Sequence, residues 1–156
     1  PFSDAIKLLA KETSLIYKSN YLIYFLSPCI SLILILMMWV IYPYYYNNLM
    51  MMLSFIYLMC CFSLGVYSML MSGWSSNSIY SMLGSLRSLA QSISYEVSLA
   101  IIMIIPMFMI DEVNMYNLKF FQDIWYIFLM LPVMLMFLFS IMAELNRTPF
   151  DFSEGE

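Results

Sequence analysis

Residues 83–100 read L-G-S-L-R-S-L-A-Q-S-I-S-Y-E-V-S-L-A and place one acidic residue, Glu96, inside a long apolar run. We predict a membrane-spanning helix over residues 86–110, with Glu96 about ten residues, or about 15 Å, along it. A charge at this depth costs about 2.5–3.5 kcal/mol on insertion scales. Glu96 is therefore expected to face the interior of a helix bundle.

A polar stripe is predicted on the face of this helix that carries Glu96. Its members recur at intervals of three and four: Ser85, Ser88, Ser92 and Glu96. Gln91 and Tyr95 flank the stripe, and Arg87 lies at its entrance. Desolvation inside a protein favours the neutral carboxyl, which can bind and release protons near neutral pH. We interpret Glu96 as a proton-relay residue; the alternative is a permanently protonated or hydrogen-bonded residue that joins helices.

The composition identifies an integral membrane protein. Of 156 residues, 63% are hydrophobic and only 10% are charged, whereas about a quarter of a soluble domain is charged. There is no histidine, and the three cysteines fall in apolar runs without metal-ligand spacing. An iron-sulfur, zinc or haem site within this chain is therefore not expected, and we interpret the cysteines as small buried apolar residues.

We predict an all-α membrane protein with one in-plane amphipathic helix followed by four transmembrane helices, forming a single membrane domain over residues 1–156. The amphipathic helix covers residues 1–19, the spans cover 22–42, 50–72, 86–110 and 121–143, and an acidic loop covers 144–156. The serine-rich segment 73–84 is predicted to be a loop between the second and third spans. Pro28 is expected to kink the first span and Pro132 to bend the fourth. Gly65 either permits close helix packing or is an unimportant small residue.

The first segment has the pattern of a helix that lies along a membrane surface. At 100° per residue, one narrow arc collects its polar residues: Ser3, Asp4, Lys7, Lys11, Ser14 and Lys18. Apolar side chains fall opposite, so the lysines are expected to face water or lipid phosphate. Glu12 interrupts the pattern at the margin of the apolar side. It either bends back to water or faces a protein cavity.

The last segment, residues 143–156, reads A-E-L-N-R-T-P-F-D-F-S-E-G-E and is dense in carboxylates: Glu144, Asp151, Glu154 and Glu156. Glu144 falls in the last turn of the fourth span, at the membrane exit. Arg147 is three residues further on, where a helix would bring the two side chains together as an ion pair. The simpler alternative is a solvated loop whose charges only keep it out of lipid.

The basic residues predict an orientation. With four spans, one side carries most of them: Lys7, Lys11, Lys18, Arg87 and Arg147. The opposite side carries only Lys119. The positive-inside rule therefore places both ends and the 73–84 segment on the inner side of the membrane, which is the matrix side if the membrane is mitochondrial and the cytoplasmic side if it is bacterial.

Three stretches resemble one family, the chain 1 membrane subunits of NADH-ubiquinone oxidoreductase. Residues 143–156 are similar to its pattern A-E-T-N-R-x-P-F-D-x-x-E-G-E, with Leu145 in place of the usual Thr. Residues 1–12, P-F-S-D-A-I-K-L-L-A-K-E, resemble its first matrix-side loop, and residues 83–100 resemble its glutamate-bearing helix. The chain begins with Pro1 and stops within the acidic loop, so it is expected to be a central piece of a longer, insect-like protein.

The resemblance implies a core subunit of the proton-pumping respiratory complex I in the mitochondrial inner membrane. It implies that Phe2, Asp4 and Lys7 form the mouth of a ubiquinone channel. It also implies a proton relay that contains Glu96, Glu144, Asp151, Glu154 and Glu156, with Arg87 and Arg147 positioning these carboxylates and favouring their ionised forms.

In this family FMN and iron-sulfur clusters belong to partner subunits of the peripheral arm, ubiquinone is the substrate, and antiporter-like membrane subunits are further partners. The resemblance implies no catalytic site complete within this chain, no metal, and no nucleic-acid partner. Two other functions remain open from the residues alone: a proton-coupled secondary transporter that uses Glu96, and a structural membrane anchor for a soluble redox arm.

Overall fold

The structure is a computed structural model that describes residues 2–12, 16–42, 44, 51–121 and 124–151. Those residues contain helices and turns but no strand, which confirms the predicted all-α class. The helices are α1 (Phe2–Ala10), α2 (Tyr21–Met38, continued by the 3-10 turn Trp39–Ile41), α3 (Ser54–Ser75), α4 (Ile79–Ile110), α5 (Leu118–Phe121), α6 (Tyr126–Leu129) and α7 (Leu131–Glu144).

Three of the described helices are long and apolar enough to cross a membrane. They are α2 with its 3-10 extension, 21 residues, α3, 22 residues, and α4, 32 residues, and a span needs about 20. They overlap the predicted spans 22–42, 50–72 and 86–110, although α4 begins seven residues before the third of these. α2 continues through Pro28 without interruption.

The predicted fourth span, residues 121–143, is divided in the structure. α5 ends at Phe121, α6 is a single turn, and the apolar helix α7 begins only at Leu131 and has 14 residues. Pro132 stands in the first turn of α7. Proline has no backbone N–H, and in a first turn this costs nothing because the N–H groups there have no partner within the helix. Pro132 therefore begins a helix and does not bend one, contrary to the prediction.

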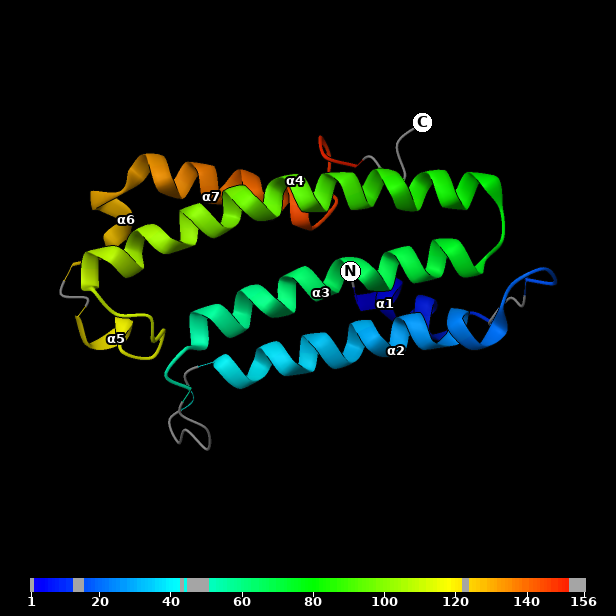
Figure 1. The fold of residues 1–156 in the computed structure, drawn as a ribbon, viewed down its shortest axis with the longest axis horizontal. Coiled ribbons are helices and arrows are strands. Elements are labelled where there is room, and N and C mark those ends of the chain that lie inside the picture. The colour runs from blue at the N-terminus through cyan, green and yellow to red at the C-terminus, as the bar shows by residue number, and fades with distance from the viewer. Residues whose placement is uncertain (1, 13–15, 43, 45–50, 122–123, 152–156) are drawn as a thin grey trace.

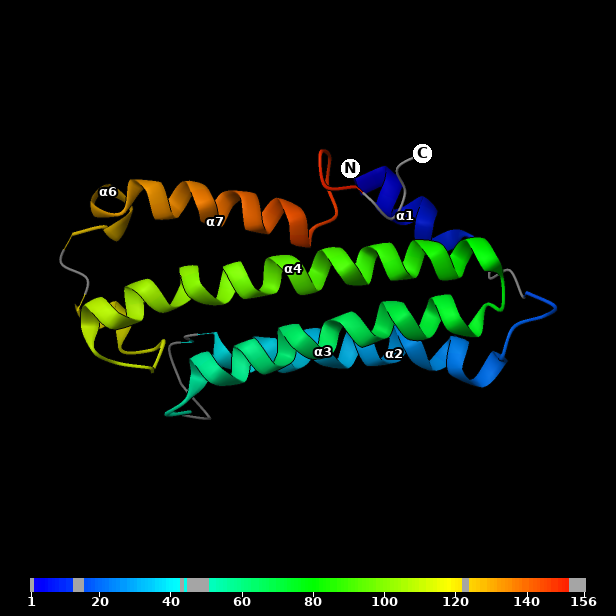
Figure 2. The same ribbon diagram turned by 45° about the horizontal axis from the view of Figure 1, so that its top comes forward.

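The helices pack in chain order: α2 against α3, α3 against α4, and α4 against α7 (Figure 1). α7 runs along the half of α4 that ends at Ile110, so that its last turn lies beside the middle of α4 (Figure 2). The buried polar residues of α2, α3, α4 and α7 are all serines: Ser27, Ser54, Ser68, Ser75, Ser85, Ser88 and Ser140. Large apolar side chains lie mostly outward. Small residues inside and apolar residues outside are typical of helices that pack in lipid.

The segment 73–84 is helical except at residues 76–78, so the predicted loop is wrong. α3 continues to Ser75, and α4 begins at Ile79 after Ser78, whose hydroxyl accepts a hydrogen bond of 3.3 Å from the backbone N–H of Ser81. Asn77 adopts the left-handed conformation (φ 53°) that reverses the chain. Serine favours both helix caps and loops, and here its caps make the connection tight.

Gly73, not Gly65, is the glycine at which two helices meet closely. A side chain at Gly73 would overlap the side chain of Ser85 on α4. Nothing lies within 4 Å of a Cβ placed on Gly65. The alternative interpretation of Gly65, a small residue with no packing role, is therefore the better one, and the α3–α4 contact depends on Gly73.

The predicted amphipathic helix is shorter than residues 1–19. α1 ends at Ala10 and contains no buried residue. Residues 13–15, which include Ser14, lie outside the described part. The backbone N–H of Asn20 donates a hydrogen bond of 2.8 Å to the carbonyl of Ser75. The start of α2 is thereby fixed to the end of α3, beside the α3–α4 turn.

Candidate functional site

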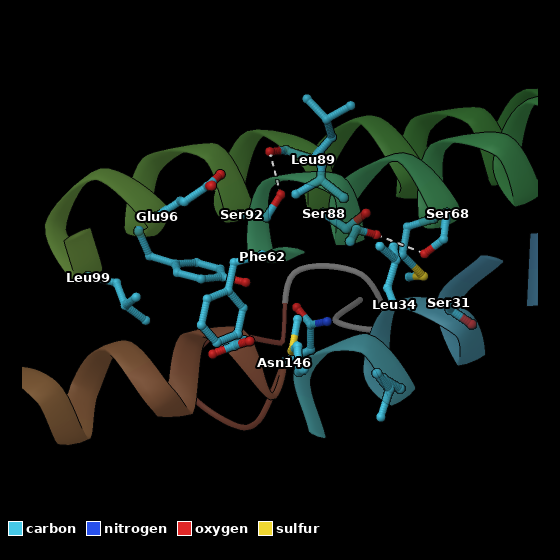
Figure 3. A pocket seen from close by; sticks show the side chains of 17 residues that line it. Ser31, Leu34, Phe62, Ser68, Ser88, Leu89, Ser92, Glu96, Leu99 and Asn146 are labelled. Carbon is cyan, nitrogen blue, oxygen red and sulfur yellow. Dashed lines mark hydrogen bonds between the residues drawn. The ribbon is translucent and has the colours of Figure 1, made fainter. Parts of the chain in front are cut away.

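A cavity of about 290 Å³ lies between α2, α3, α4 and the end of α7. Figure 3 shows that polar and apolar side chains from all of these elements line it. Apolar side chains, among them Leu34, Phe62 and Leu99, make up most of its wall. Its polar groups therefore stand in largely apolar surroundings, where electrostatic interactions are stronger than in water.

Glu96 and Glu144 both line this cavity. Glu96 comes from the middle of α4 and Glu144 is the last residue of α7, so the packing of α7 on α4 joins residues that are far apart in the sequence. Both side chains are half-buried. The prediction that Glu96 faces a protein interior agrees with this position. Glu144 lies beside the middle of α4, because α7 ends there (Figure 2).

Serine hydroxyls supply the neutral polar groups of the cavity. Ser88 and Ser92 line it from the predicted stripe, whereas Ser85 packs against Gly73. The Ser88 hydroxyl donates to the carbonyl of Ser85 and the Ser92 hydroxyl to that of Leu89, each at 2.9 Å. A hydroxyl has one proton and two acceptor lone pairs. These serines can therefore accept hydrogen bonds from a ligand or from water in the cavity without losing their own.

The end of α7 is shaped by a left-handed residue. Asn146 has φ 47°, and its N–H donates to the carbonyl of Ala143 at 3.3 Å while the N–H of Arg147 donates to that of Met142 at 3.2 Å. These two bonds form a Schellman motif, which asparagine fits because it tolerates the left-handed region. The chain turns back on itself at Asn146, and Glu144 is held at the cavity as a result.

Replacing Asn146 with valine is expected to destabilise the protein by about 1–2 kcal/mol, because a β-branched residue is strained at positive φ. Asn146→Gly should change stability much less, since glycine adopts this conformation readily. Thermal unfolding of the purified membrane assembly measures the difference. Leu145→Val is the matched control, because Leu145 is exposed and has φ −74°. Equal effects of valine at 145 and 146 would show that the left-handed turn is unimportant.

A second hollow, about 800 Å³, lies on another side of α4 and is more open. Arg87, Gln91 and Asp151 line it together with residues 148–150. Tyr95 lines both hollows, so this tyrosine stands between them. Arg87 was predicted to position the carboxylates of the acidic segment. The structure brings Arg87 and Asp151 to the same hollow.

Not all predicted site residues meet at the cavity. Arg147 follows the helix end and is exposed, and within residues 124–151 it forms no ion pair with Glu144, because the helix that would align the two ends at Glu144. Glu154 and Glu156 lie outside the described residues. Phe2, Asp4 and Lys7 lie on α1, are exposed, and line neither hollow.

Two residues that shape this region, Gln91 and Asn146, have no role that the sequence predicts. Gln91 contacts the loop after α7, and Asn146 turns that loop. The spacing of Gln91 placed it next to the polar stripe, but no periodicity within one helix reveals a hydrogen bond to a distant loop. The positive φ of Asn146 has a sequence signal, since asparagine after the last apolar residue of a helix is typical of a left-handed C-terminal cap.

Known proteins of one family match this chain over its whole length. A family model described as NADH dehydrogenase matches residues 1–156. The chain belongs to the NADH dehydrogenase family. Among its relatives, NADH-ubiquinone oxidoreductase chain 1 of Locusta migratoria is 51% identical over 157 residues, covering 100% of this chain and 50% of the relative.

Further relatives in the NADH dehydrogenase family carry the same name. NADH-ubiquinone oxidoreductase chain 1 of Anopheles gambiae is 48% identical, with coverage of 100% of this chain and 50% of the relative. The protein of that name from Artemia franciscana is 44% identical, with coverage of 100% and 53%. The chain thus spans about half the length of these relatives, and the resemblance seen in three short stretches extends over all of it.

Proposed function

We propose that this chain is part of the core membrane subunit of a proton-pumping NADH:ubiquinone oxidoreductase. In that subunit it forms part of the ubiquinone channel and of the acidic relay that couples quinone reduction to proton translocation. The shared cavity of Glu96 and Glu144 carries the proposal, because it brings two carboxyl groups from different helices into one partly enclosed space. The names of the relatives support the assignment to this complex.

In the proposed arrangement α1 lies in the membrane plane and four segments cross the inner membrane of the mitochondrion. α2, α3 and α4 are three of these spans, and α6 with α7 belongs to the fourth. Both ends of the chain face the matrix, which the distribution of lysine and arginine supports. α1 and the acidic segment then lie on the same face of the membrane.

The proposed relay begins at the acidic segment and passes inward. Asp151, with Glu154 and Glu156, receives the change in charge that accompanies quinone reduction, and Glu144 and Glu96 transmit it through the cavity. Arg87 lies in the same hollow as Asp151, where an opposite charge favours the ionised carboxylate. Arg147 has the same role toward the following acidic residues.

Electrons reach the quinone from partner subunits that hold FMN and iron-sulfur clusters. The described part of this chain contains no cluster of three or more metal-ligating residues. The proposed contribution of the chain is to shape and charge the channel. Peripheral-arm subunits at the quinone site and antiporter-like membrane subunits are the proposed partners. Phe2, Asp4 and Lys7 on the exposed helix α1 form the channel mouth together with those partners.

A photoreactive ubiquinone analogue tests this proposal in the intact complex. We expect crosslinks on α1 and on residues 144–156, and we expect excess ubiquinone to compete them away. Mass spectrometry of the labelled subunit locates the sites. Labelling confined to the lipid-facing sides of α2 and α3, insensitive to competition, would favour a transporter or a structural anchor over a quinone channel.

A further inference from the structure

Gln91 forms two hydrogen bonds to the loop after α7. Its side-chain Nε2 donates to the carbonyl of Ala143 at 2.9 Å and to the carbonyl of Phe150 at 2.8 Å. The first acceptor stands just before the loop begins and the second just before Asp151. One side chain on α4 therefore holds both ends of this loop.

The amide of Gln91 suits this contact because a primary amide has two N–H donors. Both acceptors are backbone carbonyls, which cannot donate a hydrogen bond. The side-chain amide of Gln91 must therefore point its nitrogen, and not its oxygen, toward them. The carbonyl of Ala143 already accepts a hydrogen bond from the N–H of Asn146, and its second lone pair accepts the one from Gln91. Gln91 thus adds a bond from α4 to a carbonyl that the turn after α7 already uses.

Each carbonyl is adjacent to a carboxylate of the proposed relay. Ala143 precedes Glu144, which lines the cavity shared with Glu96. Phe150 precedes Asp151, which lines the hollow shared with Arg87. Gln91 itself lies on α4 between Arg87 and Glu96. Its two hydrogen bonds therefore set where both carboxylates stand relative to the groups on α4.

We propose that Gln91 is a positioning residue that clamps the loop over residues 143–150 onto α4 and thereby fixes Glu144 and Asp151 for coupled turnover. The inference rests on the proposed function and deepens it. Gln91 carries no charge and takes no proton at neutral pH, so it acts only through the carboxylates that it places. Removal of its two donors frees the loop without changing any relay carboxylate.

Gln91→Met in the intact complex tests the clamp, because methionine has a similar length and volume but no N–H donor. We expect quinone reduction coupled to proton movement to fall about tenfold, as small misplacements of reacting groups commonly cost this much or more. Ser94→Ala is the matched control: Ser94 lines the same hollow on α4, and its hydroxyl donates only to the carbonyl of Gln91. This control should retain the wild-type rate.

Distance measurements give the readout that separates positioning from general destabilisation. Nitroxide labels at Ala90→Cys and Thr148→Cys, both exposed positions, report the separation of α4 and the loop. Cys29 and Cys60, which are exposed and not buried as predicted, are first replaced by alanine. We expect a broader distance distribution in Gln91→Met than in the wild type. An unchanged distribution would overturn the clamp.

Gln91→Glu is the second variant, for use if Gln91→Met does not assemble. A carboxylate repels both carbonyls, whereas a protonated carboxyl regains one O–H donor. The activity of Gln91→Glu relative to wild type should therefore rise as the pH falls, and a ratio independent of pH would contradict the inference.

Two outcomes separate the clamp from the relay. A freed loop with undiminished coupled turnover would overturn the clamp and leave the proposed relay standing. Full activity of Glu96→Gln would reject the relay itself.

Discussion

Replacing Glu96 with glutamine is expected to lower quinone reduction coupled to proton translocation by about a hundredfold, the lower range for loss of a proton-transferring group. Glutamine keeps the size and most of the hydrogen-bonding capacity of the carboxyl group but cannot exchange a proton. NADH-driven proton uptake by vesicles that contain the intact complex measures the effect. The complex should assemble normally, because the apolar wall of the cavity is unchanged.

Two further variants make this result specific. Glu144→Gln should have a comparable effect, since Glu144 lines the same cavity. Asp111→Asn removes an exposed carboxylate at the far end of α4, where residue 111 adopts the left-handed conformation (φ 60°) that asparagine accepts. This control should be fully active. If Glu96→Gln prevents assembly but Glu144→Gln does not impair coupling, Glu96 joins helices and does not relay protons.

Replacing Gly73 with alanine is expected to destabilise the packing of α3 on α4 by about 1–3 kcal/mol, the usual cost of overpacking. The added methyl group would overlap the side chain of Ser85, so the two helices must separate or bend. The carbonyl of Ser81 lies 3.1 Å from the same position, which restricts movement in that direction. Thermal unfolding of the purified complex measures the loss.

A second substitution tests whether the overlap is the cause. Ser85→Gly removes the side chain that the methyl group meets, so Gly73→Ala with Ser85→Gly should recover stability relative to Gly73→Ala alone. Gly65→Ala is the matched control in the same helix, because nothing lies within 4 Å of its added Cβ. Helix propensity favours alanine over glycine at both positions, so equal destabilisation by alanine at 65 and 73 would show that the close contact at Gly73 is not the cause.

The sequence predicted the spanning helices well because their signal is the length of an apolar run. α2, α3 and α4 each exceed the length that a bilayer requires. The inward position of Glu96 was predictable for a related reason: an ionisable group at that depth is costly in lipid. Both arguments use properties of one segment, and neither needs the position of its neighbours.

The errors arise where neighbours decide the outcome. Residues 73–84 looked like a loop because serine and glycine are weak helix formers, yet tight packing of Gly73 against Ser85 keeps both helices intact. Pro132 is compatible with either a bend within a helix or the first turn of a helix. It stands in a first turn here because the preceding helix, α6, ends at Leu129. The position of Glu144 beside α4 depends on where α7 stops, and Gln91 contacts the loop that follows through hydrogen bonds that no pattern in α4 encodes.

The three-residue connection between α3 and α4 also bears on how the protein enters the bilayer. Residues 76–78 are too few to let one helix insert far ahead of the other, so α3 and α4 form a helical hairpin that must partition into the membrane as a unit. In such a hairpin α3 lies beside α4, so we expect Glu96 to enter the membrane next to another helix and not on a lone one. This neighbour should reduce the insertion penalty of the carboxyl group.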